Sequence, residues 1–238
     1  MITEPSPSEP THSPTAPGPL LASGREADVF ALDDRRVLRR YRQGGDVTAE
    51  AAAMAYLRDR GYPVPAVYEA AGTDLVMERV SGPTLAEALA AGDVDPARAG
   101  RLLAELHQRL HTLPPRLGRR AGDRILHLDL HPDNVILCQT GPMVIDWRNV
   151  TEGPPDLDLA LTALILGEVG IGLHVDFAEP ARQLLTVFLR HADGDPLSHL
   201  AQALAIRTSN PTLQPDEIAA LDRAAALVVG SVDSPAPR

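Results

Sequence analysis

The chain has 238 residues, of which 44% are hydrophobic and 23% charged, a balance typical of globular proteins and not of disordered or fibrous chains. Its net charge of −10 and its sequence pI near 5.2 argue against a nucleic-acid-binding surface, which has to be basic. All 22 basic residues are arginine, which excludes any mechanism that needs a lysine, and the single Cys138 can form neither an internal disulfide nor a thiolate cluster.

The sequence contains no candidate membrane or export segment. No apolar run approaches the roughly 18 residues needed to span a bilayer, and the N-terminus lacks the basic-then-apolar order of a signal peptide. We therefore expect a soluble cytoplasmic protein that binds neither membranes nor nucleic acid. Its length fits one large domain or two closely packed lobes.

Both ends of the chain are predicted to be flexible. Residues 1–19 contain six prolines among Ser and Thr, with too few large apolar groups to offset the entropy lost on ordering. This predicts a disordered tail. Residues 231–238, with Pro235 and Pro237, have the same character and predict a second, shorter tail.

Residues 20–80 are predicted to form a small lobe. Short runs rich in strand-forming residues alternate with Gly and Asp, which indicates an antiparallel arrangement. An Ala-rich segment with apolar residues at helical spacing, ended by Gly61, predicts one helix. The predicted strands are residues 20–22, 27–32, 36–41, 66–70 and 74–80, and the predicted helix is 46–60.

Residues 81–230 are predicted to form a larger, mainly helical lobe. Ser81-Gly82-Pro83 breaks the chain at its start, and residues 125–146 form a loop-rich stretch with short strands at 135–138 and 143–145. Helices are expected at residues 96–112, 156–166, 176–191, 197–207 and 215–229. A strand-rich lobe followed by a helical one is an α+β fold.

Polar residues with metal-binding and acid–base chemistry gather in the loop-rich stretch. Asn134 and Asp146 supply hard oxygen ligands, which suit Mg²⁺ in a site that also binds phosphates. Asp129 can accept the proton of an attacking hydroxyl. A base, an amide ligand and a carboxylate ligand at this spacing match the arrangement found in kinases.

These residues resemble the aminoglycoside phosphotransferase and choline kinase-like family, the small-molecule branch of the protein-kinase-like fold. The family motif His-x-Asp-x-x-x-x-Asn with a later Ile-Asp-Trp appears here as His127, Asp129, Asn134 and Ile145-Asp146-Trp147. The resemblance implies a two-lobe fold in which Asp129 is the catalytic base. It also implies that Asn134 and Asp146 hold magnesium, that His127 braces the loop, and that Asp158 hydrogen-bonds this loop from below.

The resemblance covers most of residues 20–166 and extends into the small lobe. It implies that Val37 faces adenine and that Arg39, two positions along the same strand, takes the place of the family's lysine. Glu50 on the following helix resembles the residue that pairs with that lysine. Arg40 is the alternative if the register differs by one. An arginine can pair with a carboxylate and bind phosphate, but it is longer and planar, so it does not simply replace a lysine.

The remaining nucleotide contacts follow from the same resemblance. The loop around Ser23 and Gly24 carries one glycine where protein kinases have three, and its backbone N–H groups can cap a phosphate. The segment with Met77 resembles the hinge strand, in which the Glu78 carbonyl and the Val80 amide hydrogen-bond adenine. Met77 itself is expected to be a core residue first and a wall of the adenine site second.

Two histidine patterns leave a zinc enzyme open as an alternative. His127, Asp129 and His131 alternate as in a metallohydrolase cluster, but no further His-rich segment supplies the remaining ligands. His107 and His111 lie one helical turn apart as in zinc proteases, but a glutamine follows His107 where that mechanism needs a carboxylate. A helix packed against the lobe explains this second pattern without a metal.

The predicted function is transfer of the γ-phosphate of ATP, with GTP as an alternative donor, to a hydroxyl of a small acceptor. Residues 151–238 carry 12 acidic residues against five arginines, which suits a cationic acceptor, although a solvated acidic surface explains the same charge. The rival prediction is a weak or inactive nucleotide-binding pseudokinase, because Arg39 replaces a lysine and the phosphate loop has one glycine. The sequence leaves the acceptor and the oligomeric state open.

Overall fold

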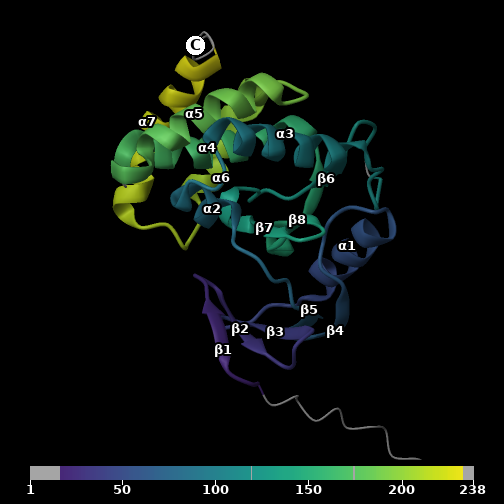
Figure 1. The fold of residues 1–238 in the computed structure, drawn as a ribbon. Coiled ribbons are helices and arrows are strands. Elements are labelled where there is room, and N and C mark those ends of the chain that lie inside the picture. The colour runs from purple at the N-terminus through teal and green to yellow at the C-terminus, as the bar shows by residue number, and fades with distance from the viewer. Residues whose placement is uncertain (1–16, 119, 174, 233–238) are drawn as a thin grey trace, which may run out of the picture.

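The computed structural model describes residues 17–118, 120–173 and 175–232. They form a small lobe built on an antiparallel sheet and a larger, mainly helical lobe (Figure 1). The predicted α+β two-lobe fold is thereby confirmed. Most of the two predicted tails, 1–19 and 231–238, lies outside the described residues. Within the first of them, Gly18 and Pro19 hydrogen-bond to the backbone of Ala31.

The sheet of the small lobe has the strand order β1-β2-β3-β5-β4, and each neighbouring pair is antiparallel. Helix α1 (Thr48–Asp59) begins where the Asp46 carboxylate accepts the Thr48 N–H, and it buries Met54 and Leu57 in the core. The strands are β1 (Leu20–Ser23), β2 (Ala27–Ala31), β3 (Arg36–Tyr41), β4 (Val67–Ala71) and β5 (Asp74–Glu78).

The large lobe packs its helices around a continuous apolar core. Leu103, Leu110, Trp147 and Phe188 are fully buried in it. The helices are α2 (Leu85–Ala91), α3 (Pro96–Thr112), α4 (Pro155–Glu168), α5 (Val175–His191), α6 (Leu200–Thr208) and α7 (Pro215–Val232). The strands are β6 (Arg124–Leu126), β7 (Val135–Cys138), β8 (Gly141–Val144) and β9 (Thr151–Gly153), and the short helical turns are η1 (Pro132–Asn134), η2 (Trp147–Asn149), η3 (Val169–Leu173) and η4 (Pro196–His199).

The segment that joins the two lobes is pressed against strand β7. The Pro83 carbonyl accepts a hydrogen bond from the Leu137 N–H (2.8 Å), and Thr84 pairs with Ile136. Gly82 has a φ of +148°, and a Cβ at this position would lie 2.2 Å from the Leu137 carbonyl oxygen. Only glycine fits so close an approach, so the breaker in the sequence marks a required contact of the joining segment with the large lobe.

The structure differs from the predicted elements mainly in short segments. Strands β6 and β9 were not predicted, because each has three residues and each depends on pairing with the other across a long loop. The helix predicted at 197–207 is divided into the turn η4 and helix α6, which begins at Leu200. Among the helices of the described residues, none combines the length and apolar character that crossing a bilayer requires.

Candidate active site

The loop that carries Asp129 is fixed from below by one buried carboxylate. Asp158, on helix α4, accepts the backbone N–H groups of His127 (3.0 Å) and Leu128 (2.7 Å) and lies 3.0 Å from His111 Nε2. Burial alone raises the pKa of Asp158, but the hydrogen bond with His111 and the nearby His107 and His127 outweigh it and hold the pKa well below its usual 3.8. Asp158 is therefore ionised and holds Leu128 in a left-handed conformation (φ 63°).

His127 joins this loop to the end of strand β8. Its Nδ1 accepts the Asp129 N–H (3.2 Å), so the proton lies on Nε2, which donates to the Ile145 carbonyl (3.0 Å). The ring is fully buried and lies against Trp147, with 4.5 Å between the ring centroids. Burial lowers the pKa of His127, which keeps the ring neutral. The two segments that carry Asp129 and Asp146 are thus linked directly.

Asn134, the last residue of the turn η1, lies beside Asp129. Its Nδ2 donates to the Asp129 carbonyl (2.8 Å) and lies 3.4 Å from the Asp129 carboxylate and 3.2 Å from His131 Nε2. No group in the described part of the chain donates to Asn134 Oδ1. The amide is therefore oriented by its nitrogen, and its carbonyl oxygen stays available to a ligand.

Asp146 is bonded from the small lobe by Arg39. Arg39 Nη2 donates to Asp146 Oδ1, and Nη1 donates to Glu50 Oε1 (3.1 Å). The Tyr41 hydroxyl donates to the other oxygen of Glu50 (2.8 Å). Burial raises the pKa of Asp146, but the Arg39 guanidinium outweighs it and holds the pKa below its usual value. Asp146 itself is left-handed (φ 64°), a sparsely populated conformation for a residue with a side chain.

The register of β3 decides between the two candidate arginines. Arg39 lies opposite Leu75 and points to Glu50 and Asp146. Arg40 points to the other face of the sheet, where it forms a two-bonded ion pair with Asp74 (2.7 and 2.5 Å). Arg39 is therefore the arginine that reaches the site.

A cavity of about 740 Å³ brings the predicted residues of the large lobe together. Asp129, Asn134 and Asp146 line it, as does Gly24 from the small lobe. Ser23 is not among the lining residues, and its hydroxyl donates to Asp28 (2.6 Å). The residues predicted around adenine do not line this cavity either. They lie on or next to strands β3 and β5: Val37, Met77, Glu78 and Val80.

The loop of Gly24 has a geometry that the sequence did not reveal. Gly24 N–H donates to the Ala27 carbonyl (2.9 Å), so this amide is already used within the turn. Arg42 donates to the carbonyl oxygens of Gly24 (2.6 Å) and Arg25 (2.7 Å). The amides left without an acceptor within the described residues are those of Arg25 and Glu26. A phosphate at this loop would meet these two N–H groups first.

The far wall of the cavity comes from helices that carry no recognisable motif. Arg207 on α6 makes two hydrogen bonds of 2.8 Å to Glu168 at the end of α4. Arg25 of the small lobe donates to Glu217 (2.8 Å) and to the Thr212 carbonyl (3.2 Å). Sequence reasoning missed Glu168, Arg207 and Glu217 because they follow Asp129 at distances that no local pattern connects.

His107, His111, His127 and His131 do not form a zinc site with other described residues. Both ring nitrogens of His127 are used in hydrogen bonds within the chain. His107 lies 2.8 Å from the Leu103 carbonyl and 3.1 Å from Thr162, and burial lowers its pKa to about 4. Across residues 17–118, 120–173 and 175–232, no three His, Cys, Asp or Glu side chains gather as a metal site. The two histidine patterns therefore serve packing and loop structure.

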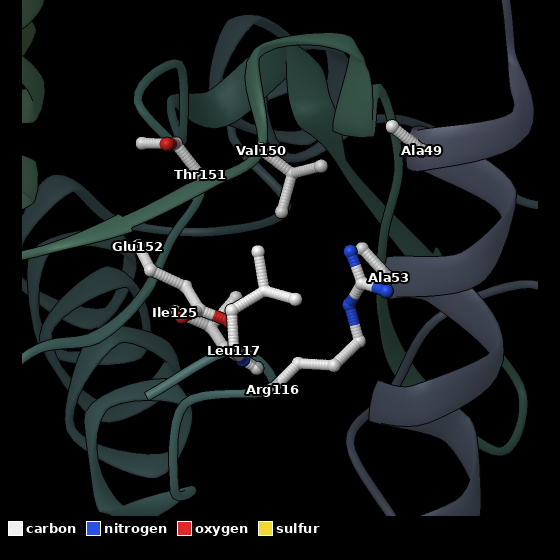
Figure 2. A pocket seen from close by; sticks show the side chains of 8 residues that line it. All are labelled: Ala49, Ala53, Arg116, Leu117, Ile125, Val150, Thr151 and Glu152. Atoms are coloured by element: carbon white, nitrogen blue, oxygen red, sulfur yellow. The ribbon is translucent and has the colours of Figure 1, made fainter. Parts of the chain in front are cut away.

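A second, smaller cavity of about 210 Å³ lies between α1 and the β6–β9 pair (Figure 2). Arg116 reaches toward Ala53 of α1, with Leu117 and Val150 beside it. The Glu152 carboxylate in its wall is already bonded to the N–H groups at positions 117 and 118. None of the residues predicted for catalysis or binding lines this cavity.

Comparison with known proteins identifies the family of this chain. A family model described as the phosphotransferase enzyme family (APH) matches residues 18–125 and 120–197. The chain belongs to this family. The resemblance noted from the motif of Asp129 and Asn134 is thereby confirmed at the family level. No curated protein matches the sequence.

Solved structures of phosphotransferases share the fold at low sequence identity. Aminoglycoside phosphotransferase APH(4)-Ia matches with a TM-score of 0.59 and 15% identity over 90% of this chain and 93% of its own. The amicoumacin kinase hAmiN, in complex with AMP-PNP, Ca²⁺ and Ami, matches with a TM-score of 0.56 and 14% identity over 92% and 90%. The gentamicin complex of APH(2")-IIa gives 0.55 and 14% over 91% of each chain. At such identities these likenesses establish the fold.

Proposed function

We propose that this chain is a small-molecule kinase that transfers the γ-phosphoryl group of ATP, or of GTP, to a hydroxyl of a small acceptor. The observation that carries the proposal is the convergence of Asp129, Asn134 and Asp146 on one cavity, with the Arg39–Glu50 pair behind them. A base, two oxygen ligands and a cation are the parts that phosphoryl transfer needs. We propose residues 20–80 as the nucleotide-binding lobe and residues 81–230 as the catalytic and acceptor-binding lobe.

The residues present fit a divalent cation of the Mg²⁺ type. Asn134 Oδ1 receives no donor within the described residues, and the Asp146 side chain is 38% exposed at the cavity. Both offer hard oxygen atoms, which Mg²⁺ prefers. When bound, such an ion neutralises charge that develops on the phosphate oxygens. The solved relatives include one bound to ADP and one bound to AMP-PNP with Ca²⁺, which supports a nucleotide and a divalent ion here.

The residues around the cavity have distinct roles in the proposed reaction. Asp129 orients the acceptor hydroxyl and accepts its proton, since its carboxylate faces the cavity and Asn134 fixes its backbone carbonyl. Arg39 neutralises phosphate charge and is held by Glu50. His127 and Asp158 hold the loop so that Asp129 and Asp146 keep their relative positions. Val37, Met77, Glu78 and Val80 remain the proposed contacts of the nucleotide base.

The acceptor wall of the cavity carries carboxylates that are already paired. Glu168 is bonded to Arg207, and Glu217 is bonded to Arg25. A cationic acceptor would have to compete with these arginines for the two carboxylates. Related kinases are described with gentamicin and with amicoumacin, which supports a small hydroxyl-bearing acceptor of that general kind.

A turnover assay distinguishes the proposed kinase from the rival function, a pseudokinase that binds nucleotide without transferring phosphate. The purified protein is incubated with Mg·ATP or Mg·GTP and a panel of small hydroxyl compounds, half of them cationic, and ADP or GDP release is followed. The proposal predicts release that depends on one acceptor class, together with a mass gain of one phosphate on that acceptor. Tight nucleotide binding with no release for any acceptor would favour the pseudokinase.

A further inference from the structure

The tip of the loop between β1 and β2 is arranged as an anion-binding turn. Arg42 binds the carbonyl oxygens of Gly24 and Arg25 from one side. The N–H groups of Arg25 and Glu26 have no acceptor among the described residues. Backbone N–H groups left free in a turn attract anions, because an unpaired donor keeps its partial positive charge. Gly24, Arg25 and Glu26 all line the large cavity.

Arg148 faces this loop from the large lobe. It lies in the turn η2, two residues after Asp146, and lines the same cavity. Its Nε contacts Glu26 Oε2 (2.5 Å), and its guanidinium lies over the Tyr41 ring, 4.0 Å from the centroid. The guanidinium also passes close over Gly45, where a Cβ would lie 3.5 Å from Nη1 and 3.7 Å from Nη2. Tyr41 and Gly45 thus fix its direction.

Among the arginines that line the cavity, Arg148 is the one whose two terminal nitrogens donate no hydrogen bond to a described residue. By contrast, Arg207 donates twice to Glu168, and Arg25 donates to both Glu217 and the Thr212 carbonyl. The ion-pair partner of Arg148, Glu26, is a partly exposed carboxylate on the loop that would cover phosphates. An exposed ion pair of this kind is easily exchanged for a more highly charged anion.

We propose that Arg148 is a second phosphate-binding cation of the site, and that Glu26 occupies it when no nucleotide is bound. The phosphate chain displaces the Glu26 carboxylate and is received by the guanidinium and by the free N–H groups of Arg25 and Glu26. A planar guanidinium matches the oxygens of a phosphate, which carry more charge than one carboxylate. The inference rests on the proposed nucleotide site and adds a residue to it.

The two partners of this pair are expected to affect nucleotide binding in opposite directions. Arg148→Gln removes a phosphate ligand and should weaken Mg·ADP and Mg·AMP-PNP binding by about tenfold or more. Glu26→Gln removes the competing carboxylate and should tighten binding by about threefold. Arg148→Lys should fall between Arg148→Gln and the unchanged protein. If the ion pair only tethers the loop, both substitutions remove the same contact, and both should change the affinity for nucleotide in the same direction.

Calorimetric titration of the full chain with Mg·AMP-PNP measures these affinities, and thermal unfolding reports that each variant is folded. Because Glu26→Gln also removes a charge near the phosphates, it is repeated in the Arg148→Gln background, where its gain should largely disappear. Asp33→Asn, which removes an exposed ion pair with Arg36 outside the cavity lining, serves as the matched control and should leave affinity within about twofold.

Two results overturn the inference while leaving the proposed function intact. One is an Arg148→Gln variant that binds nucleotide as tightly as the unchanged protein. The other is a shift in the same direction for Arg148→Gln and Glu26→Gln. If the unchanged protein itself fails to bind nucleotide, the proposed function fails and the inference falls with it.

Discussion

The two halves of the site are held together in different ways. In the large lobe, Asp158, His127 and Asn134 form buried hydrogen bonds that fix the loop of Asp129. In the small lobe, the loop of Gly24 to Glu26 is held to the large lobe by exposed ion pairs, Arg25 with Glu217 and Glu26 with Arg148. Buried pairs are costly to break and exposed pairs are not. We therefore expect the proposed catalytic half to be the more rigid one and the loop proposed to cover the phosphates to exchange its partners for a ligand.

The largest expected effect comes from removing the carboxylate below the catalytic loop. Asp158→Asn replaces an ionised acceptor of two backbone N–H groups and His111, and should lower the free energy of unfolding by about 3 kcal/mol or more. Asp156→Asn is the matched control on the same helix, because Asp156 bonds the less buried Asp195 N–H, and should cost about 1 kcal/mol or less. Denaturant unfolding of both variants measures the difference, and equal losses would contradict the buried network.

The same carboxylate predicts how the protein's stability depends on pH. Because the pKa of Asp158 is lower in the folded chain than its usual 3.8, its contribution is complete above about pH 5 and is lost as the pH falls through the folded value. The difference in unfolding free energy between the unchanged protein and Asp158→Asn should therefore shrink as the pH is lowered below about 4. Denaturant unfolding at stepped pH measures it. A difference that stays constant or widens with acid would mean that the carboxylate is not stabilised in the folded state.

Arg39 links the rigid half to the small lobe, and its loss should be the next largest effect. Arg39→Ala leaves Glu50 and Asp146 without their shared cation and should cost about 2–3 kcal/mol of unfolding free energy. Arg40→Ala, one residue along and on the other face, breaks a more exposed pair with Asp74 and should cost about 1 kcal/mol or less. Thermal and denaturant unfolding measure the loss of stability in the two variants. Equal losses would contradict the special role of Arg39 in linking the two lobes at the site.

The smallest effect is expected at the exposed tether. Glu217→Gln removes the ion pair with Arg25, whose side chain is 56% exposed, and should change the free energy of unfolding by less than about 1 kcal/mol. The loss should diminish further at high salt, because screening weakens exposed pairs. Unfolding at low and high ionic strength tests this. A loss of unfolding free energy as large as that of Arg39→Ala would contradict the proposed difference between the buried and the exposed ion pairs.

The sequence predicted the catalytic half better than the small-lobe half. Asp129, Asn134 and Asp146 lie within one motif whose residues are close in the chain, so spacing alone indicated a shared site. Helix 96–112 was predicted with its observed bounds, because its leucines follow one face and Pro114 follows its end. Local pattern and tertiary structure agree in these segments.

What could not be predicted depends on contacts between distant segments. Arg148 and Glu26 meet only when the lobes are packed, and nothing in either neighbourhood singles them out. Arg207 and Glu168 are likewise brought together by helix packing. The prediction that N–H groups around Ser23 and Gly24 cap a phosphate did not include the turn, in which the Gly24 N–H is already bonded to the Ala27 carbonyl. A side chain's partner cannot be derived from spacing when the partner comes from another lobe.

The measurement that tests the central claim most directly compares Asp129→Ala with Asp146→Ala in nucleotide titration and in turnover with an accepted hydroxyl compound. We predict that both variants lose at least about 100-fold in turnover, because one removes the base and the other a metal ligand. Only Asp146→Ala should markedly weaken Mg·nucleotide binding. Undiminished turnover in Asp129→Ala, or undiminished nucleotide binding in Asp146→Ala, would contradict the assigned roles.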